Sequence, residues 1–162
     1  MELIHLEQKH FDAVCHIYMQ GIATGNATFQ KEAPSWEDWD KSHLQDCRIV
    51  ATESGSVAGW AALTPVSSRC VYAGVAEVSV YVGDEHRGKG LGKLLLQELI
   101  RQSEAIGLWT LQSGIFPENT ASIRIHESCG FRIIGYREKI GKLSGFWRDN
   151  VVMERRSKVV GL

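Results

Sequence analysis

The pattern of hydrophobic and polar positions is clearest in the middle of the chain, where its period changes from two residues to nearly four. Residues 76–82 alternate apolar and polar side chains, which predicts a strand with two unlike faces. From Gly90 to Ile106, leucines recur at the i, i+3, i+4 and i+8 spacing of an amphipathic helix, and Gly107 stands where a helix C-terminus favours glycine. A strand followed directly by a helix is therefore the clearest predicted pair of elements.

The flanking segments predict further elements of both kinds. Apolar residues recur at helical spacing over 11–18, and Gly21 and Gly25 then interrupt the pattern. Ser35 followed by Asp38 has the form of a capping box, which predicts a short helix. The other predicted elements are a first strand at 1–6, a hairpin of strands 48–52 and 57–63, a strand at 108–115, a helix at 119–129 closed by Gly130, and a final strand pair at 131–140 and 146–154. This mixture predicts an α/β fold.

Length and composition indicate one globular domain spanning residues 1–162. The chain is 44% hydrophobic and 23% charged, and its 18 basic and 19 acidic residues leave a net charge of -1. Such a balance provides no strong field to attract nucleic acid or an anionic membrane. The N-terminus lacks the features of a secretory signal, and no stretch approaches the roughly 20 apolar residues of a membrane span. We therefore expect a cytoplasmic protein without nucleic-acid or membrane partners.

The cysteines and histidines do not predict a metal site. Cys15, Cys47, Cys70 and Cys129 are widely scattered, and the six histidines share no ligand spacing with them. The cysteines also lack the density of a disulfide framework. We expect them to be small buried residues and expect no structural metal.

The segment Arg87-Gly88-Lys89-Gly90-Leu91-Gly92 joins the predicted strand to the predicted helix. Glycines let the backbone approach a ligand closely, and the free amides at a helix N-terminus favour a phosphate. Arg87 and Lys89 add positive charge at the same place. This segment, called the glycine loop below, suits a pyrophosphate, although the glycines alone are equally consistent with a tight strand-to-helix turn.

Two better-known glycine motifs do not fit the glycine loop. Residues 83–89 satisfy G-x-x-x-x-G-K, but Gly90 stands where a nucleotide triphosphatase needs a Ser or Thr to bind magnesium. A dinucleotide fold places its glycines after the first strand, with an acidic residue about twenty positions on. Here they lie in the middle of the chain, after several predicted strands.

At this point the sequence resembles a known family. The glycine loop is similar to the R/Q-x-x-G-x-G/A acetyl-CoA signature of the Gcn5-related N-acetyltransferase (GNAT) superfamily. Further segments resemble its phosphinothricin acetyltransferase branch, whose relatives act on methionine sulfoximine, methionine sulfone or arsinothricin. They are Glu77-Val78-Ser79-Val80-Tyr81-Val82, Phe116-Pro117-Glu118-Asn119, Ile125-His126-Glu127, Gly130-Phe131 and Gly145-Phe146-Trp147-Arg148-Asp149. The resemblance covers about 48–155, whereas the N-terminal third agrees loosely, chiefly over 25–32.

The resemblance implies a fold and a cofactor. The fold would have a mixed central sheet, flanked by helices and splayed between strands 76–82 and 108–115, where the arm of acetyl-CoA would lie. A backbone N–H near Val80 or Tyr81 would polarise the thioester carbonyl, and Asn119 would contact the pantetheine arm. The full set of implied cofactor-binding residues is Val80, Tyr81, Val82, Arg87, Gly88, Lys89, Gly90, Leu91, Gly92 and Asn119.

The resemblance also implies two catalytic side chains. Glu77 matches the acidic residue that serves as general base in the branch, and His126 stands where much of the superfamily has a tyrosine that protonates the thiolate. A histidine titrates near neutral pH and can act as acid or base. Taken without the resemblance, Glu77 is better explained as a solvated or salt-bridged strand residue, and His126 is equally well explained as a surface or core histidine.

The acceptor pocket is implied in the same way. Phe29, Arg69 and Tyr72 match positions that line it in the branch, and an arginine suits a carboxylate or phosphinate through paired hydrogen bonds. Taken alone, the three residues read as a core aromatic, a loop charge and a strand-end aromatic. Trp36 and Trp39, at helical spacing, are expected to pack in the core.

The resemblance therefore implies an enzyme that transfers acetyl from acetyl-CoA to the α-amine of a small amino-acid-like acceptor, of the kind met in antibiotic or herbicide resistance. No cysteine stands in a recognised nucleophile setting, so direct attack in a ternary complex is expected. The branch implies a homodimer. Two alternatives stay open: a protein or peptide N-acetyltransferase, and a non-catalytic acyl-CoA-binding sensor.

Overall fold

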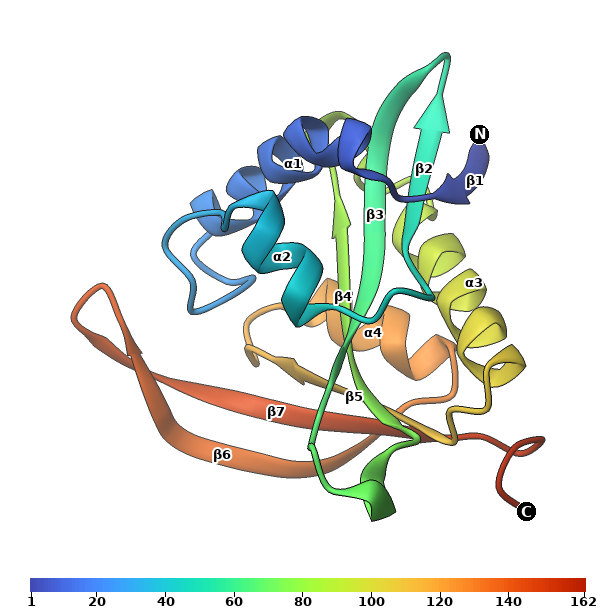
Figure 1. Ribbon diagram of the computed structural model, residues 1–162. Coiled ribbons are helices and arrows are strands. Elements are labelled where there is room, and N and C mark those ends of the chain that lie inside the picture. The colour runs from blue at the N-terminus through green and yellow to red at the C-terminus, as the bar shows by residue number, and fades with distance from the viewer.

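A seven-stranded sheet of order β1-β2-β3-β4-β5-β7-β6 runs through the protein, with helices on both faces (Figure 1). The computed structural model describes residues 1–162. Its strands are β1 Glu2–His5, β2 Ile49–Glu53, β3 Ser56–Pro65, β4 Val75–Val82, β5 Thr110–Ile115, β6 Arg132–Leu143 and β7 Phe146–Arg156. Its α-helices are α1 Phe11–Ala23, α2 Trp36–Ser42, α3 Leu91–Ala105 and α4 Thr120–Ser128, and single 3-10 turns cover Gln8–His10, Cys70–Tyr72 and Asp84–His86.

The predicted elements all occur, with bounds shifted by a few residues. Ser35 caps α2 by accepting a hydrogen bond from the Asp38 amide, at 3.2 Å. Gly107 and Gly130 end their helices with positive φ values of 87° and 89°. The prediction that Gly21 interrupts the first helix is wrong, because α1 continues to Ala23 and buries Gly21.

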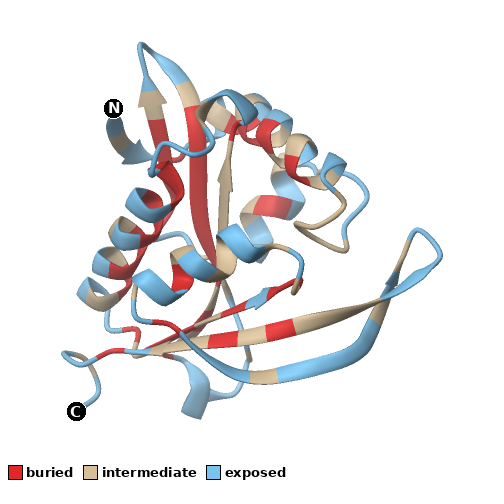
Figure 2. Cartoon of the chain, turned by 180° about the vertical axis from the view of Figure 1, so that it is seen from behind, coloured by how far each residue is buried: buried red, intermediate tan, exposed pale blue.

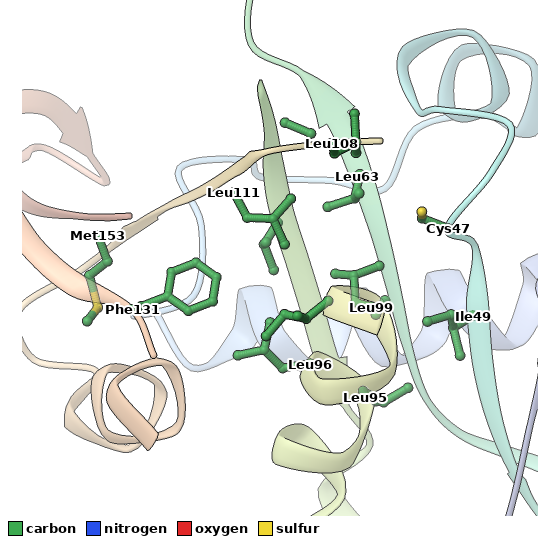
Figure 3. Close-up of a cluster of buried hydrophobic side chains, with 14 of the residues drawn as sticks. Cys47, Ile49, Leu63, Leu95, Leu96, Leu99, Leu108, Leu111, Phe131 and Met153 are labelled. Carbon is green, nitrogen blue, oxygen red and sulfur yellow. The ribbon is translucent and has the colours of Figure 1, made fainter. Parts of the chain in front are cut away.

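The two faces of the sheet support two separate cores. Ala61 and Leu63 of β3 face α3, whereas Trp60 and Ala62 face α1 and α2, because alternate residues of a strand point to opposite faces. Figure 3 shows the larger cluster, in which Leu95, Leu96 and Leu99 lie between α3 and the sheet. Buried residues run along β2 and β3, while the β6–β7 hairpin extends away from them (Figure 2).

The remaining aromatic and sulfur predictions have mixed outcomes. Trp36 and Trp39 stack on each other with ring centroids 5.8 Å apart, and Trp39 is buried, so their packing role is confirmed. All four cysteines are free. Cys47 alone is fully buried, and burial raises the pKa of its thiol to about 12. Cys70 is exposed on a 3-10 turn, so the expectation that every cysteine is buried is wrong. None of the helices combines the length and apolar character that crossing a membrane requires.

The predicted splay lies between β4 and β5, the parallel pair of the sheet. These strands are in register at Val75, Ala76 and Glu77 of β4, and their pairing ends there. On its other edge β5 stays paired with β7 along its whole length. The far half of β4 therefore has one edge paired with β3 and one edge open.

Gly21 marks a tight contact that the sequence pattern did not reveal. A Cβ built on Gly21 would lie 2.9 Å from two ring carbons of the half-buried Tyr81. We predict that Gly21→Ala destabilises the protein by about 1–2 kcal/mol, because the overpacking cost exceeds the gain in helix propensity. Urea unfolding measures this change. Gly135→Ala is the control, since no heavy atom lies within 4 Å of its Cβ position. Equal stability of the Gly21 variant and the native protein would show that the Tyr81 ring moves freely.

Candidate functional site

A cavity of about 980 Å³ opens where β4 and β5 separate. Its wall combines residues that are far apart in the sequence. They come from α1, the 24–34 segment, β4, β5, α4 and the β6–β7 hairpin, and among them are Phe29, Glu77, Val80, Arg87, Asn119, His126, Arg137 and Asn150. The cavity therefore brings together most of the side chains that the sequence marked as candidates.

Glu77 lies at the fork of the splay. It is the last residue of β4 with a partner in β5, Gln112, and its half-buried carboxylate lines the cavity. Burial raises the pKa of this carboxyl, and the positive charge of Arg137 offsets part of that rise. A carboxylate with a raised pKa is a stronger base, which suits a group that takes a proton from an amine.

The open edge of β4 presents backbone amides to the cavity. Gly83 donates its N–H to the Ala58 carbonyl on β3 at 2.8 Å, and the β3–β4 register runs without a bulge from there to Ala76. Because N–H directions alternate along a strand, the Tyr81 amide points to β3 and the Val80 amide points into the splay. Of the two amides predicted to polarise a thioester, Val80 therefore has the suitable direction.

The glycine loop leads from the open edge of β4 into α3. Gly88 and Gly90 have φ values of 75° and 82°, and α3 begins at Leu91 without a side-chain cap. The first-turn amides of α3 are thus free to bind an anion, as a pyrophosphate requires. Arg87 supplies positive charge beside the loop; its guanidinium lies 2.9 Å from Asp84 and donates to the Val82 carbonyl at 3.4 Å. The residues present therefore fit the phosphate end of acetyl-CoA.

Two loop residues have a packing role that the motif conceals. The Leu91 side chain is buried in the core, so only its backbone is available to a ligand. A Cβ on Gly92 would lie 3.1 Å from the Ile125 side chain, which shows that this glycine lets α3 and α4 pack closely. Gly88 and Gly90, by contrast, have open space around their Cβ positions.

His126 is buried beside the cavity with one ring nitrogen unused. Its Nδ1 lies 2.7 Å from the Ser122 carbonyl oxygen, so Nδ1 carries the proton and donates it. Burial lowers the pKa of the ring, which favours the neutral form, although the Ser122 hydrogen bond opposes this. In that form Nε2 is an acceptor, and it is buried without any protein partner.

Asn119 and Arg148 fasten the 24–30 segment over the cavity. Asn119 caps α4 by accepting from the Ser122 amide at 3.2 Å, and its Nδ2 donates to the Asn26 carbonyl at 3.3 Å. Arg148 donates to the Gly25 carbonyl and to Asn26 Oδ1, both at 2.7 Å. The Asn119 side chain lines the cavity, but its amide already holds the chain in place.

The three residues expected to bind the acceptor separate into two groups. Phe29 lines the cavity, where it meets the Phe116 ring edge to face at 4.8 Å and covers Gly141. Arg69 and Tyr72 lie on or beside the exposed Cys70–Tyr72 turn, with the guanidinium 5.9 Å from the Tyr72 ring centroid. Neither of them lines the cavity of this chain.

Sequence reasoning missed Arg137 and Asn150, which face each other as partners on β6 and β7 and line the cavity. No motif singles them out, because their approach to β4 depends on how the hairpin folds back across the splay. Gly114 of β5 is the one sequence feature connected with Asn150. The Asn150 Oδ1 lies 2.8 Å from the Cβ position of Gly114, so any larger residue at position 114 would collide with it. Nowhere do three or more His, Cys, Asp or Glu side chains form a group placed to hold a metal ion.

Comparisons with known proteins agree with this geometry. Residues 11–131 match the model of the acetyltransferase (GNAT) family. The chain is 38% identical over 140 residues to the L-methionine sulfoximine/L-methionine sulfone acetyltransferase of Pseudomonas paraeruginosa (strain DSM 24068 / PA7), which covers 82% of this chain and 81% of that relative.

Solved structures are similar over nearly the whole chain. The phosphinothricin acetyltransferase of Sinorhizobium meliloti, solved in complex with acetyl-CoA, has a TM-score of 0.87 and 27% identity over 99% of this chain and 90% of that one. The ribosomal-protein-alanine N-acetyltransferase of Brucella melitensis has a TM-score of 0.90 and 28% identity over 97% of this chain and 100% of that one. With its splayed mixed sheet and its glycine loop at the start of α3, the chain belongs to the GNAT family and is an acetyl-CoA-dependent N-acetyltransferase.

Proposed function

We propose that the enzyme acetylates the α-amine of a small amino-acid-like acceptor, of the phosphinothricin, methionine sulfoximine, methionine sulfone or arsinothricin type, by direct attack in a ternary complex. One observation carries the proposal: a half-buried carboxylate, Glu77, shares a cavity with the open amide edge of β4 that leads to the glycine loop. The names of the relatives support the acceptor class.

Glu77 prepares the nucleophile. An amino-acid amine is largely an ammonium ion near neutral pH, and it attacks a carbonyl only after it loses a proton. The Glu77 carboxylate, made more basic by burial, accepts that proton directly or through water. Acetyl-CoA supplies the acetyl thioester, and the Val80 N–H donates to the oxyanion that forms when the amine nitrogen bonds to the carbonyl carbon.

His126 completes the transfer of protons. The attacking nitrogen releases a second proton as the C–S bond breaks, and the departing thiolate needs one. The free Nε2 of His126 accepts this second proton from the nitrogen and then donates it to the thiolate sulfur. This role needs a neutral ring with an unprotonated Nε2 at the start, which is the form that burial favours.

A cysteine intermediate does not fit the cavity. Cys15 of α1 lines it, but burial, together with the Asp12 charge, raises the pKa of that thiol. A raised pKa reduces the thiolate fraction needed for nucleophilic attack. Direct attack by the amine is therefore the simpler route.

The walls of the cavity favour a small acceptor. Phe29 and Phe116 pack against each other, and Arg148 holds the segment that carries Phe29. The similarity to a ribosomal-protein-alanine N-acetyltransferase keeps a peptide N-terminus as the second candidate. The presence of both Glu77 and His126 in the cavity argues against a non-catalytic sensor. A resistance role, a homodimer, a cytoplasmic location and substrate contacts from Arg69 and Tyr72 remain part of the proposal.

Thiol release from acetyl-CoA tests the acceptor class. We expect saturable turnover with at least one of phosphinothricin, methionine sulfone, methionine sulfoximine or arsinothricin, and little with short peptides, because the packed Phe29 and Phe116 rings restrict a longer chain. The panel includes ordinary amino acids and a no-acceptor control. Turnover restricted to peptides would instead establish the protein-modifying alternative, and acetyl-CoA binding without any turnover would favour the sensor.

Glu77→Gln tests the base. We expect kcat/KM to fall by about 10²- to 10⁴-fold, which is the usual contribution of a general base, with the dissociation constant of acetyl-CoA unchanged. In the native enzyme kcat/KM should decline as pH falls through the raised pKa of Glu77, because protonation removes the base. That acidic decline should disappear in the variant. Glu127→Gln, on the exposed side of α4, should leave the profile intact. An unchanged profile in Glu77→Gln would remove the base assignment.

Gly90→Leu tests the phosphate-binding role of the glycine loop. A side chain at φ 82° strains the loop and occupies the space beside the free amides of α3, so acetyl-CoA binding should weaken by about 10- to 100-fold. Gly107→Leu is a matched control at the other end of α3, with φ 87° and equally open space. Calorimetric titration compares the two. Similar affinities in both variants would count against this assignment.

A further inference from the structure

Arg137 combines two features: its guanidinium has no partner, and it lines the cavity. The guanidinium groups of Arg69, Arg124 and Arg137 take part in no ion pair or hydrogen bond, whereas those of Arg48, Arg87, Arg101, Arg132, Arg148, Arg155 and Arg156 all do. Of the three unpaired arginines, Arg137 alone lines the cavity. A guanidinium without a partner at a ligand site is a ready donor for a carboxylate.

The other carboxylate and guanidinium groups of the cavity are already neutralised. Arg87 lies 2.9 Å from Asp84, and Glu118 lies 3.2 Å from Arg148. The two histidines in the wall, His43 and His126, both have pKa values lowered by burial and are neutral. Glu77 and Arg137 therefore remain as one free negative and one free positive group in the same cavity.

The topology sets these two charges against each other across the splay. Glu77 is on β4 at the fork, and Arg137 is on β6, which reaches the cavity through its pairing with β7 beside β5. The positive charge of Arg137 lowers the pKa of Glu77 and so opposes the rise that burial causes. Asn150, the partner of Arg137 on β7, adds a polar side chain to the same wall.

A free α-amino acid has the matching arrangement of charges. Its ammonium and carboxylate groups are joined to one carbon, so the first can face a carboxylate while the second faces a guanidinium. We propose that Arg137 binds the α-carboxylate of the acceptor and thereby holds its amine at Glu77. The proposal rests on the proposed function and deepens it, because it makes a free α-carboxylate the feature that selects the acceptor. A peptide N-terminus or an amino-acid amide lacks that group.

The experiment compares L-methionine sulfone with its α-carboxamide in the native enzyme and in Arg137→Gln. We expect the native enzyme to prefer the free acid, and Arg137→Gln to lower kcat/KM for the acid by about 10- to 100-fold while leaving the amide nearly unchanged. Arg137→Lys keeps the charge without the paired donors, so it should recover part of the preference. Arg132→Gln, on the same strand but paired with Glu154 outside the cavity, is the control.

The pH profile with the amide provides a readout that a merely structural role would not move. Removing the Arg137 charge should raise the pKa of Glu77, so the acidic decline of kcat/KM should move to higher pH in Arg137→Gln and stay in place in Arg137→Lys. Equal use of acid and amide by the native enzyme, or equal loss of both in Arg137→Gln, would overturn this inference and leave the proposed function standing. Turnover of peptides but of neither small compound would overturn both.

Discussion

The separation of β4 from β5 after Glu77 is the constraint on which the site depends. Two parallel strands that stopped pairing would ordinarily leave backbone amides without partners, which is costly in a closed interior. Here the separation opens a cavity, and the amide edge of β4 faces that cavity. The strands are held at their bases by three paired positions and by the core beneath, where Leu111 of β5 and Val78 of β4 pack with α3. The gap is thus a fixed part of the fold.

The wall opposite β4 is assembled from segments that have no local reason to meet. Arg148 of β7 bonds to Gly25 and Asn26, more than 120 positions earlier in the chain. Asn119, at the start of α4, bonds to the same segment while it caps its own helix. These contacts place Phe29 against Phe116. Polar side chains that look like surface residues in the sequence therefore shape this wall of the cavity.

Electrostatics in the cavity follow from which charges the fold pairs and which it leaves free. Burial favours the protonated form of Glu77 and the neutral form of His126, so the same physical cause makes the carboxylate more basic and leaves the ring with an acceptor nitrogen. Arg87 forms an ion pair with Asp84, and Glu118 forms one with Arg148. The fold thus leaves one unpaired negative charge at Glu77 and one unpaired positive charge at Arg137. The two charges nearly cancel, but they give the cavity a negative end and a positive end.

The sequence by itself determined the elements and the chemistry that depends on neighbouring residues. The periods of two and nearly four marked β4 and α3, and Ser35, Gly107 and Gly130 marked helix ends, because capping and left-handed backbone are local properties. The glycine loop pointed to acetyl-CoA through its resemblance to the GNAT signature, which is a motif of neighbouring residues. The prediction that Gly21 interrupts the first helix failed because this glycine makes room for Tyr81 of a distant strand.

Only the tertiary structure decided which side chains share the cavity. Residue spacing does not show that β6 and β7 reach the splay, so nothing in the sequence marked Arg137 and Asn150 as cavity residues. Arg69 and Tyr72 were expected to line the cavity, but in this chain they lie on or beside an exposed turn. The choice between the Val80 and Tyr81 amides likewise needed the β3–β4 register, because a strand directs successive N–H groups to opposite edges. Long-range pairing fixes both outcomes, and no local pattern encodes it.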